Sequence, residues 1–197
     1  MMVSLIFFSL GNPGPINRHS TGHYILKQLE EGFDAPPMTR KKKYSISRVD
    51  NVFFVRSNSY MNDSGALLRS FLTEEHVRQC VVVVVYDDFE LNMPKVRLQQ
   101  FKRNESHNGI KSVAQVLNSL AIQGYKLGVG IGPKPVGASK DAMASWVLSK
   151  FSREENELLE TSMQYVYKYV HEIIEREGDI GDCGKLNATI TKAMSES

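Results

Sequence analysis

The chain has 197 residues, of which 42% are hydrophobic and 23% charged, and these values are typical of a globular domain with its own core. A net charge of +2 does not by itself indicate nucleic-acid binding, and two cysteines, Cys80 and Cys183, exclude a disulfide framework. The sequence has no apolar run of about 18 residues, which excludes a transmembrane helix, and no basic segment before its first apolar run, so we expect an intracellular protein without a signal peptide.

The first part of the chain alternates between short apolar runs and amphipathic stretches. The apolar run 2–8 predicts a buried strand, and an Asn-Pro-Gly turn leads from it into a helix predicted over 20–32. A hairpin is expected from 44–48 and 52–56, followed by a helix over 64–72.

Five consecutive valines, Val81 to Val85, predict a central strand with helices on both faces, and we expect this strand to end at Tyr86-Asp87-Asp88-Phe89-Glu90. The remaining predicted elements are a strand over 95–101, a helix over 109–120, a strand over 125–131, a Pro/Gly loop over 132–137, a helix capped by Ser152 that continues to about Glu177, and a short helix from Lys185. Strands that alternate with helices predict a one-domain α/β fold over residues 1–197.

Basic residues are concentrated in the middle of the chain. Residues 39–111 hold thirteen Lys or Arg against eight Asp or Glu, and 112–150 hold four against one. Residues 151–197 reverse the balance, with five basic against ten acidic side chains. This distribution suggests one face suited to phosphates, although ordinary surface variation explains it equally well.

The turn after the first predicted strand carries the strongest functional signal. Ligands of open α/β sheets bind at the carboxyl ends of strands, where this turn places Asn12 and His19. His19 also lies near the start of the next helix, where the helix dipole disfavours an imidazolium. We therefore expect a neutral His19 at pH 7, as a general base requires, although a lone histidine here is more often only a polar helix start.

Other polar clusters complete a set of groups that could hydrolyse a substrate with an activated water. A carboxylate beside a histidine fixes its tautomer, and carboxamides donate hydrogen bonds to a developing oxyanion. We assign His19 as the base, Asp87 as the group that orients it, and Asn62 and Asn108 as the donors.

Several other kinds of site are excluded by their motifs. The sequence contains neither the G-x-S-x-G of a serine hydrolase nor a phosphate-binding P-loop. The glycines of 128–132 do not form a dinucleotide motif, because Pro133 follows them. His19 and His23 are four residues apart but have no evident third metal ligand, so we expect neither a metal nor a cofactor.

Six motifs occur in an order that is itself informative. They are Gly11-Asn12-Pro13-Gly14 with Arg18-His19, Tyr60-Met61-Asn62 with Ser64-Gly65, Asp87-Asp88 after the valines, His107 to Ser112, Gly130 to Pro133, and Val147 to Phe151. Each motif alone is weak, but in this order and at these intervals the chain resembles the bacterial-type peptidyl-tRNA hydrolase family, as a divergent member.

The resemblance implies a single-domain, three-layer α/β/α sandwich with a mixed, twisted sheet, and metal-free hydrolysis of the ester between a peptide and tRNA. We also expect a monomer with no membrane partner, acting in the cytoplasm or, as an alternative, the mitochondrion. By position, the resemblance implies that His19 is the catalytic base and that Asp87 is the acid that supports it. Asn12 matches the residue that distinguishes blocked from free aminoacyl ends, and His107 matches a histidine that neighbours the site. The positions that hold the tRNA 3′ end and the peptide are matched by Tyr60, Asn62 and Asn108.

The sequence departs from the family pattern in four places. The segment Pro15-Ile16-Asn17 is about three residues shorter than usual and lacks a tyrosine, and Ser20 replaces an asparagine. Residues 101–106 lack the usual glycines. Gln99 and Gly128 occupy the positions of a phosphate-contacting basic pair, for which the nearby candidate substitutes are Arg97, Lys102, Arg103 and Lys126.

Two alternative functions remain open on the sequence alone. The short loop and the missing glycines fit an RNA-binding relative that has lost turnover, which would bind RNA tightly without cleaving the ester. An unrelated small-molecule esterase on an α/β fold would act on small esters with no dependence on salt.

Overall fold

The computed structural model describes residues 2–14 and 16–197, so Pro15 of the short loop lies outside the described part. The helices and strands are β1 (Ser4–Ser9), η1 (Arg18–Ser20), α1 (Thr21–Gly32), β2 (Thr39–Arg40), β3 (Tyr44–Val49), β4 (Val52–Ser57), η2 (Met61–Asp63), α2 (Ser64–Glu74), β5 (Cys80–Asn92), β6 (Val96–Gln100), α3 (Asn108–Leu120), β7 (Gln123–Gly132), α4 (Lys140–Val147), α5 (Arg153–Glu175) and α6 (Cys183–Ser195). No helix of the described residues is long and apolar enough to cross a membrane.

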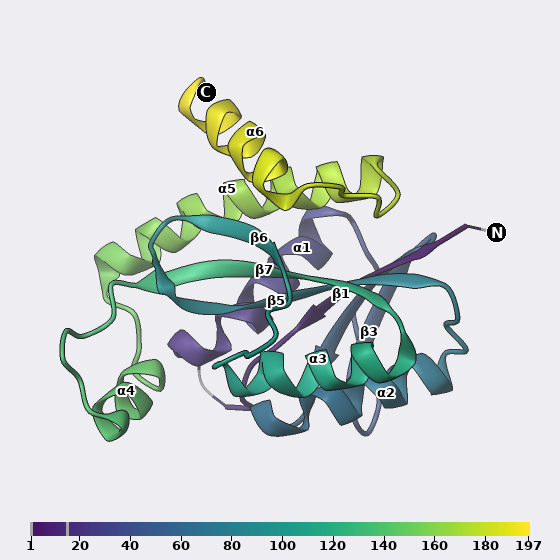
Figure 1. Ribbon diagram of the computed structural model, residues 1–197, viewed down its shortest axis with the longest axis horizontal. Coiled ribbons are helices and arrows are strands. Elements are labelled where there is room, and N and C mark those ends of the chain that lie inside the picture. Colours follow the sequence, from purple (N-terminus) through teal and green to yellow (C-terminus); the bar gives the residue numbers. More distant parts are fainter. Residues whose placement is uncertain (1, 15) are drawn as a thin grey trace.

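All seven strands belong to one twisted sheet in the order β2-β3-β4-β1-β5-β7-β6 (Figure 1). Strands β4, β1, β5 and β7 run parallel, whereas β2, β3 and β6 complete the edges through antiparallel pairs. Because the parallel strands share one direction, the turns that follow β1, β4 and β5 emerge at the same edge of the sheet. The mixed α/β fold predicted for the chain is confirmed.

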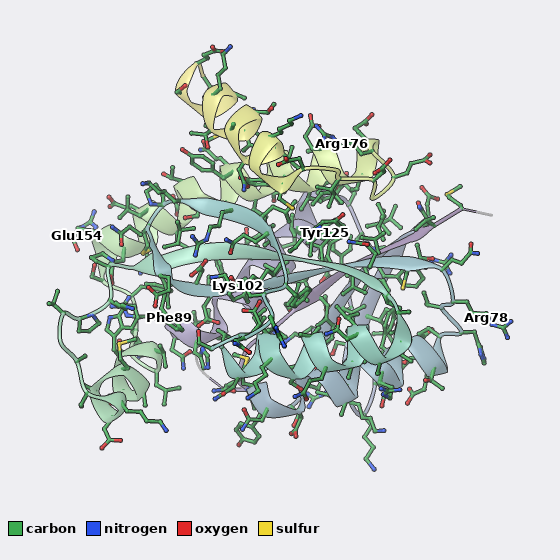
Figure 2. The ribbon with its side chains drawn as sticks, viewed as in Figure 1. Arg78, Phe89, Lys102, Tyr125, Glu154 and Arg176 are labelled. Atoms are coloured by element: carbon green, nitrogen blue, oxygen red, sulfur yellow. The ribbon has the colours of Figure 1, made fainter. Side chains whose placement is uncertain are left out.

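Side chains alternate between the two faces of the sheet, so neighbouring residues of one strand enter different cores. Phe7 and Val83 pack with α1, α5 and α6, while Phe8 and Val84 pack with α2 and α3. Figures 1 and 2 show these helix layers on opposite sides of the sheet, with side chains filling the space between. The valine run is therefore a central strand covered on both faces, as expected.

Three features of the fold differ from the sequence prediction. Strand β5 does not end in the polar run from Tyr86 to Glu90 but continues through it to Asn92, because Asp87, Asp88 and Asn92 are paired with β7. Helix α4 was not expected, since its eight residues include none that is buried in a core. Helix α6 spans 13 residues and is longer than the short tail helix that the sequence suggested.

Gly22 lets α1 approach the carboxyl end of the sheet closely. A Cβ atom at Gly22 would lie 2.4 Å from the carbonyl oxygen of Leu10 and 2.5 Å from that of Val85, both backbone atoms that cannot rotate away. We expect Gly22→Ala to lower the free energy of unfolding by about 1–3 kcal/mol in urea titrations. Gly184→Ala, whose Cβ would meet only a carboxylate oxygen at 3.1 Å, is the control. A Gly22→Ala protein as stable as the wild type would contradict this close packing.

Candidate active site

His19 lies on η1, a single helical turn between the loop after β1 and the start of α1. The Ser20 hydroxyl oxygen accepts a hydrogen bond from the backbone N–H of Asn17 at 2.8 Å, and the hydroxyl donates to the Asn17 carbonyl at 2.9 Å. Thr21 Oγ1 donates to the Arg18 carbonyl at 2.6 Å. Ser20, one of the departures from the family pattern, therefore helps to hold the turn that presents His19.

Asp87 lies between two histidines at the carboxyl end of β5. Its carboxylate is fully buried, with Oδ2 2.7 Å from His19 Nδ1 and Oδ1 3.0 Å from His107 Nε2. Burial alone would raise the pKa of Asp87, but the two histidines hold this pKa below its ordinary value. An ionised carboxylate only accepts hydrogen bonds, so both contacts require a proton on the histidine nitrogen.

The second nitrogen of each histidine then has a defined role. His107 is the N-cap of α3, and its Nδ1 accepts a hydrogen bond from the backbone N–H of Ile110 at 3.3 Å. A neutral His107 therefore carries its proton on Nε2 and donates it to Asp87. His19 donates from Nδ1, which leaves its Nε2 as the nitrogen able to take a proton from water. The pairing of His19 with Asp87 that the sequence suggested is present as a direct contact.

The environment of His19 reverses the direction in which the helix dipole was expected to shift its pKa. Burial lowers the pKa of His19, but the charge of Asp87 and the hydrogen bond to it outweigh burial and raise this pKa above 6.5. The expectation that the helix start would lower the pKa of His19 was therefore wrong. A buried carboxylate in direct contact acts more strongly than a partial helix charge.

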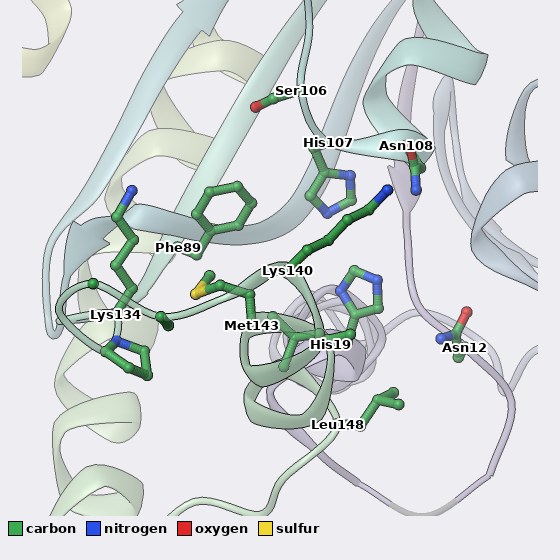
Figure 3. Close-up of a pocket in the computed structure, with 15 residues that line it drawn as sticks. Asn12, His19, Phe89, Ser106, His107, Asn108, Lys134, Lys140, Met143 and Leu148 are labelled. Atoms are coloured by element: carbon green, nitrogen blue, oxygen red, sulfur yellow. The ribbon is translucent and has the colours of Figure 1, made fainter.

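A pocket of about 660 Å³ opens beside the two histidines (Figure 3). Its polar side contains Asn12, His19, His107 and Asn108. The opposite side is apolar and consists mainly of Met143, Ala144 and Val147 of α4 with the adjacent Leu148, together with Phe89 of β5. Lys134 and Lys140 also line it, and Lys134 is paired with Glu90 at 2.6 Å. Sequence reasoning missed this wall, because no core periodicity marks α4.

The candidate substrate-binding residues divide into two groups. Asn12 and Asn108 line the pocket, and Asn12 Oδ1 accepts a hydrogen bond from the backbone N–H of Met61 at 3.0 Å, which leaves its amide group as a donor. Tyr60 and Asn62 flank Met61 but are exposed and do not line this pocket. The structure thus brings one of the two expected oxyanion donors, Asn108, to the histidines.

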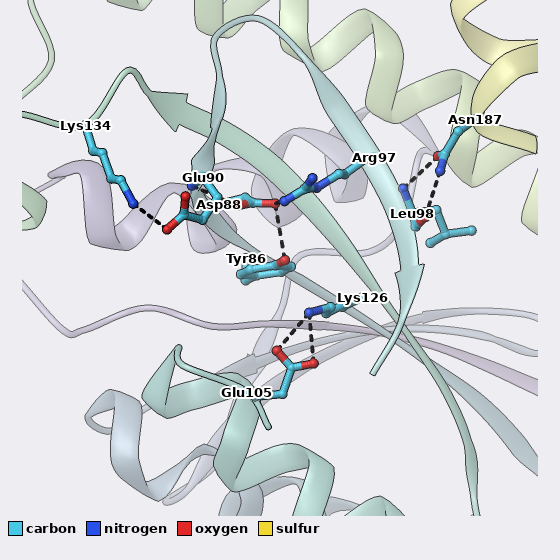
Figure 4. Close-up of polar contacts among 9 residues, drawn as sticks. All are labelled: Tyr86, Asp88, Glu90, Arg97, Leu98, Glu105, Lys126, Lys134 and Asn187. Carbon is cyan, nitrogen blue, oxygen red and sulfur yellow. Dashed lines mark hydrogen bonds and ion pairs between the residues drawn. The ribbon is translucent and has the colours of Figure 1, made fainter. Parts of the chain in front are cut away.

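The four basic candidates for tRNA contact also divide into two groups. Arg97 donates to Asp88 Oδ2 at 3.0 Å, and the ammonium of Lys126 contacts both oxygens of Glu105 at 2.8 Å (Figure 4). Lys126 is only 3% exposed, so its charge is used inside the fold and is not presented to a phosphate. Lys102 and Arg103 are exposed, and neither has an ion-pair partner among residues 2–14 and 16–197.

The side chains of His19, Asp87 and His107 could also be considered as metal ligands, because their ligand atoms lie within 4.8 Å of one another. Ligands placed about 2.1 Å from a tetrahedral zinc lie roughly 3.4 Å apart. Here nitrogen and oxygen are 2.7 and 3.0 Å apart, and these distances are those of direct hydrogen bonds. The cluster therefore fits proton transfer better than metal coordination.

Comparison with known proteins agrees with the motifs. The profile of the family described as "Peptidyl-tRNA hydrolase" matches residues 6–193. The "Probable peptidyl-tRNA hydrolase" of Schizosaccharomyces pombe is 33% identical over 168 residues, which cover 80% of this chain and 77% of that protein. The "Peptidyl-tRNA hydrolase" of Thermotoga petrophila is 32% identical over 181 residues, covering 88% and 92%.

A solved structure shows the same fold. The peptidyl-tRNA hydrolase of Acinetobacter baumannii superimposes with a TM-score of 0.71 at 21% identity, over 91% of this chain and 95% of that one. Because the family profile spans nearly the whole sequence and two relatives exceed 30% identity, this chain belongs to the peptidyl-tRNA hydrolase family.

Proposed function

We propose that this chain hydrolyses the ester between tRNA and a peptide, or an N-blocked aminoacyl group, with a water activated by His19 and without a metal. The observation that supports this most directly is the Asp87 carboxylate, which contacts His19 and His107 at the wall of an open pocket. Membership of the family supports the same reaction and identifies the substrate class.

The proposed reaction follows from the position of the proton on His19, which the contact with Asp87 places on Nδ1. His19 Nε2 takes a proton from a water as the water oxygen attacks the ester carbonyl, while Asp87 stabilises the imidazolium that forms. The side-chain amide of Asn108 donates a hydrogen bond to the oxyanion of the tetrahedral intermediate. His19 then returns its proton to the departing ribose oxygen, which leaves a free tRNA hydroxyl and a carboxylic acid.

Asn12 is suited to recognise the blocked end of the substrate. Its oxygen is occupied by the Met61 N–H, so its amide faces the substrate as a donor. A peptide or N-acetyl group has a carbonyl next to the α-nitrogen that can accept this hydrogen bond. A free aminoacyl group has a charged ammonium there instead, and an amide donor disfavours that group. We propose that Asn12 distinguishes blocked from free aminoacyl-tRNA in this way.

Lys102 and Arg103 are proposed to contact the tRNA backbone. Because each phosphate contact releases counterions, we expect the double variant Lys102→Ala with Arg103→Ala to raise KM and to reduce the slope of log kcat/KM against log salt concentration by about one per lost contact. Arg78→Ala is the control, since Arg78 is an exposed residue just before β5, at the right edge of the view in Figure 2, whereas Lys102 lies near the middle. Equal effects of the control and the double variant would contradict the assignment.

The reaction itself is tested with N-acetyl-aminoacyl-tRNA, assayed with and without a chelator that removes divalent cations. We expect free tRNA to be released at the same rate in both conditions. An inactive wild-type protein that binds tRNA tightly would instead support the non-catalytic alternative. Activity on small esters that is independent of salt would support the unrelated esterase.

We further propose that residues 1–197 act as one domain and as a monomer. Light scattering at assay concentrations tests the oligomeric state, and a dimer mass would overturn this part of the proposal.

The cytoplasm is the proposed compartment, with the mitochondrion as its alternative, and fractionation of cells distinguishes them.

A further inference from the structure

Arg18, the residue immediately before His19, is buried although it is charged, with 8% of its surface exposed. Its guanidinium lies 4.9 Å from the ring centre of Phe151 and 5.2 Å from that of Trp146. Its Nη1 and Nη2 are each 3.0 Å from an oxygen of Glu155. The charge is therefore compensated by one carboxylate and by the faces of two aromatic rings.

The same residue is also bound through Ser149. Arg18 Nε donates to Ser149 Oγ at 3.1 Å, and the Arg18 backbone N–H donates to the Ser149 carbonyl at 3.1 Å. All these partners belong to the 146–155 segment, which includes the end of α4 and the start of α5. Arg18 thus joins η1 to a part of the chain more than 120 residues away in sequence.

These contacts connect the two sides of the pocket. His19, which directly follows Arg18, stands on the polar side, whereas Val147 and Leu148, which lie between Trp146 and Ser149, form part of the apolar side. Among residues 2–14 and 16–197, the other side-chain hydrogen bonds of η1 join Ser20 to Asn17 and His19 to Asp87, and neither reaches the 146–155 segment.

We propose that Arg18 is a positioning residue, which fixes His19 against Asp87 and sets the distance between His19 and the apolar wall of the pocket. This inference rests on the proposed function, in which His19 is the base. Arginine suits the position because its planar guanidinium contacts both rings and both carboxylate oxygens at once, whereas lysine offers a single point charge. A reacting group displaced by about 1 Å can lose roughly a hundredfold in rate, so a loose turn is costly.

The experiment compares Arg18→Met, Arg18→Lys and Glu155→Gln with wild type. Methionine is close to arginine in the length of its side chain, so Arg18→Met keeps much of the apolar packing but removes the charge and the planar guanidinium. We expect it to lower kcat for N-acetyl-aminoacyl-tRNA at least tenfold, with a smaller rise in KM. Arg18→Lys keeps the charge opposite Glu155 and is expected to recover part of kcat. Glu155→Gln is expected to fall between wild type and Arg18→Met.

A second measurement reports position without turnover. The contact with Asp87 raises the pKa of His19, so an NMR titration of His19 would report whether the contact is kept. If Arg18 holds this contact, the pKa of His19 in Arg18→Met moves down toward 6.5. Tyr167→Phe is the matched stability control, because it removes a hydrogen bond of 2.8 Å between α5 and the Gln28 carbonyl and leaves η1 untouched. It is expected to lower Tm without changing kcat or the pKa of His19.

The outcomes separate a positioning role from a structural one. If Arg18→Met lowers Tm but keeps the wild-type kcat per folded molecule and the wild-type pKa of His19, the proposal is overturned. Should Arg18→Met fail to fold, the same comparison is made with Glu155→Gln and decides in the same way. An inactive wild-type protein would overturn the proposed function, yet the NMR comparison would still decide whether Arg18 positions His19.

Discussion

Replacing His19 by alanine is expected to lower kcat for hydrolysis of N-acetyl-aminoacyl-tRNA by about 10²–10⁴-fold, the usual contribution of a general base. The loss is large because His19 Nε2 is the nitrogen left free beside the pocket to take a proton from water. KM is expected to change much less, since most of the substrate's contacts lie elsewhere. Both kcat and KM are obtained from the release of free tRNA over time at a series of substrate concentrations, and a single-turnover measurement with enzyme in excess gives the rate of the chemical step.

The control for this variant is His171→Ala. His171 is an exposed residue of α5 whose ring lies 4.9 Å from that of Phe33, so its removal changes a surface contact and no group of the pocket. It is expected to retain wild-type kcat. If His19→Ala were as active as His171→Ala, another group would have to activate the water and the proposed mechanism would be wrong.

Asp87→Asn is expected to lower kcat by about 10²–10⁴-fold through the tautomer of His19. The new side chain has one acceptor oxygen and one donor NH₂ group. His107 must donate from Nε2, because its Nδ1 is bound to the Ile110 N–H, so the oxygen of Asn serves His107. The NH₂ group then faces His19 Nδ1, which must accept. The proton of neutral His19 therefore lies on Nε2. This is the nitrogen that must be unprotonated to take a proton from water, so the base is blocked.

The pH dependence gives this variant an independent signature. His19 acts as a base only when neutral, so wild-type activity rises with pH and levels off above the pKa of His19, which lies above 6.5. Without the charge of Asp87, the effect of burial is unopposed and lowers this pKa. The midpoint of the rate profile is therefore expected to move to lower pH in Asp87→Asn, as measured by kcat/KM between about pH 5 and 9.

Asp88→Asn provides the comparison for the pH profile. Asp88 is adjacent in sequence but contacts Arg97 instead of a histidine. We expect its substitution to leave the midpoint unchanged. A midpoint that stays in place in Asp87→Asn, or rises, would show that Asp87 does not set the protonation of His19.

The position of the candidate site residues could be predicted from local patterns to a useful degree. Apolar runs before Asn12 and Asp87 predicted strands, and the polar residues after them were expected to form the site because ligands of α/β sheets bind at the carboxyl ends of strands. The order of the motifs was sufficient to suggest the family, which the profile match then showed. The extension of β5 was missed because Asp87 and Asp88 are polar, although their buried charges have partners in the folded chain.

Other properties depend on contacts between distant segments and were not predictable. Lys126 was a reasonable candidate for phosphate binding until the structure placed it against Glu105. Helix α4 lacks a buried face, so it has no periodic signal, yet Met143 and Val147 form the apolar wall of the pocket. The direction of the His19 pKa shift was also missed, since it depends on Asp87, 68 residues further along the chain.

The sequence by itself determined most strands and helices of the two cores and the family, and it was enough to propose His19 as the base, because periodicity and short motifs are properties of neighbouring residues. Tertiary structure alone decided that Asp87 joins two histidines, that Arg18 connects their turn to the 146–155 segment, and which basic side chains form ion pairs within the described part of the chain. The physical reason is that protonation and pairing follow from the groups that folding brings within a few ångströms, and no pattern of adjacent residues records those distances.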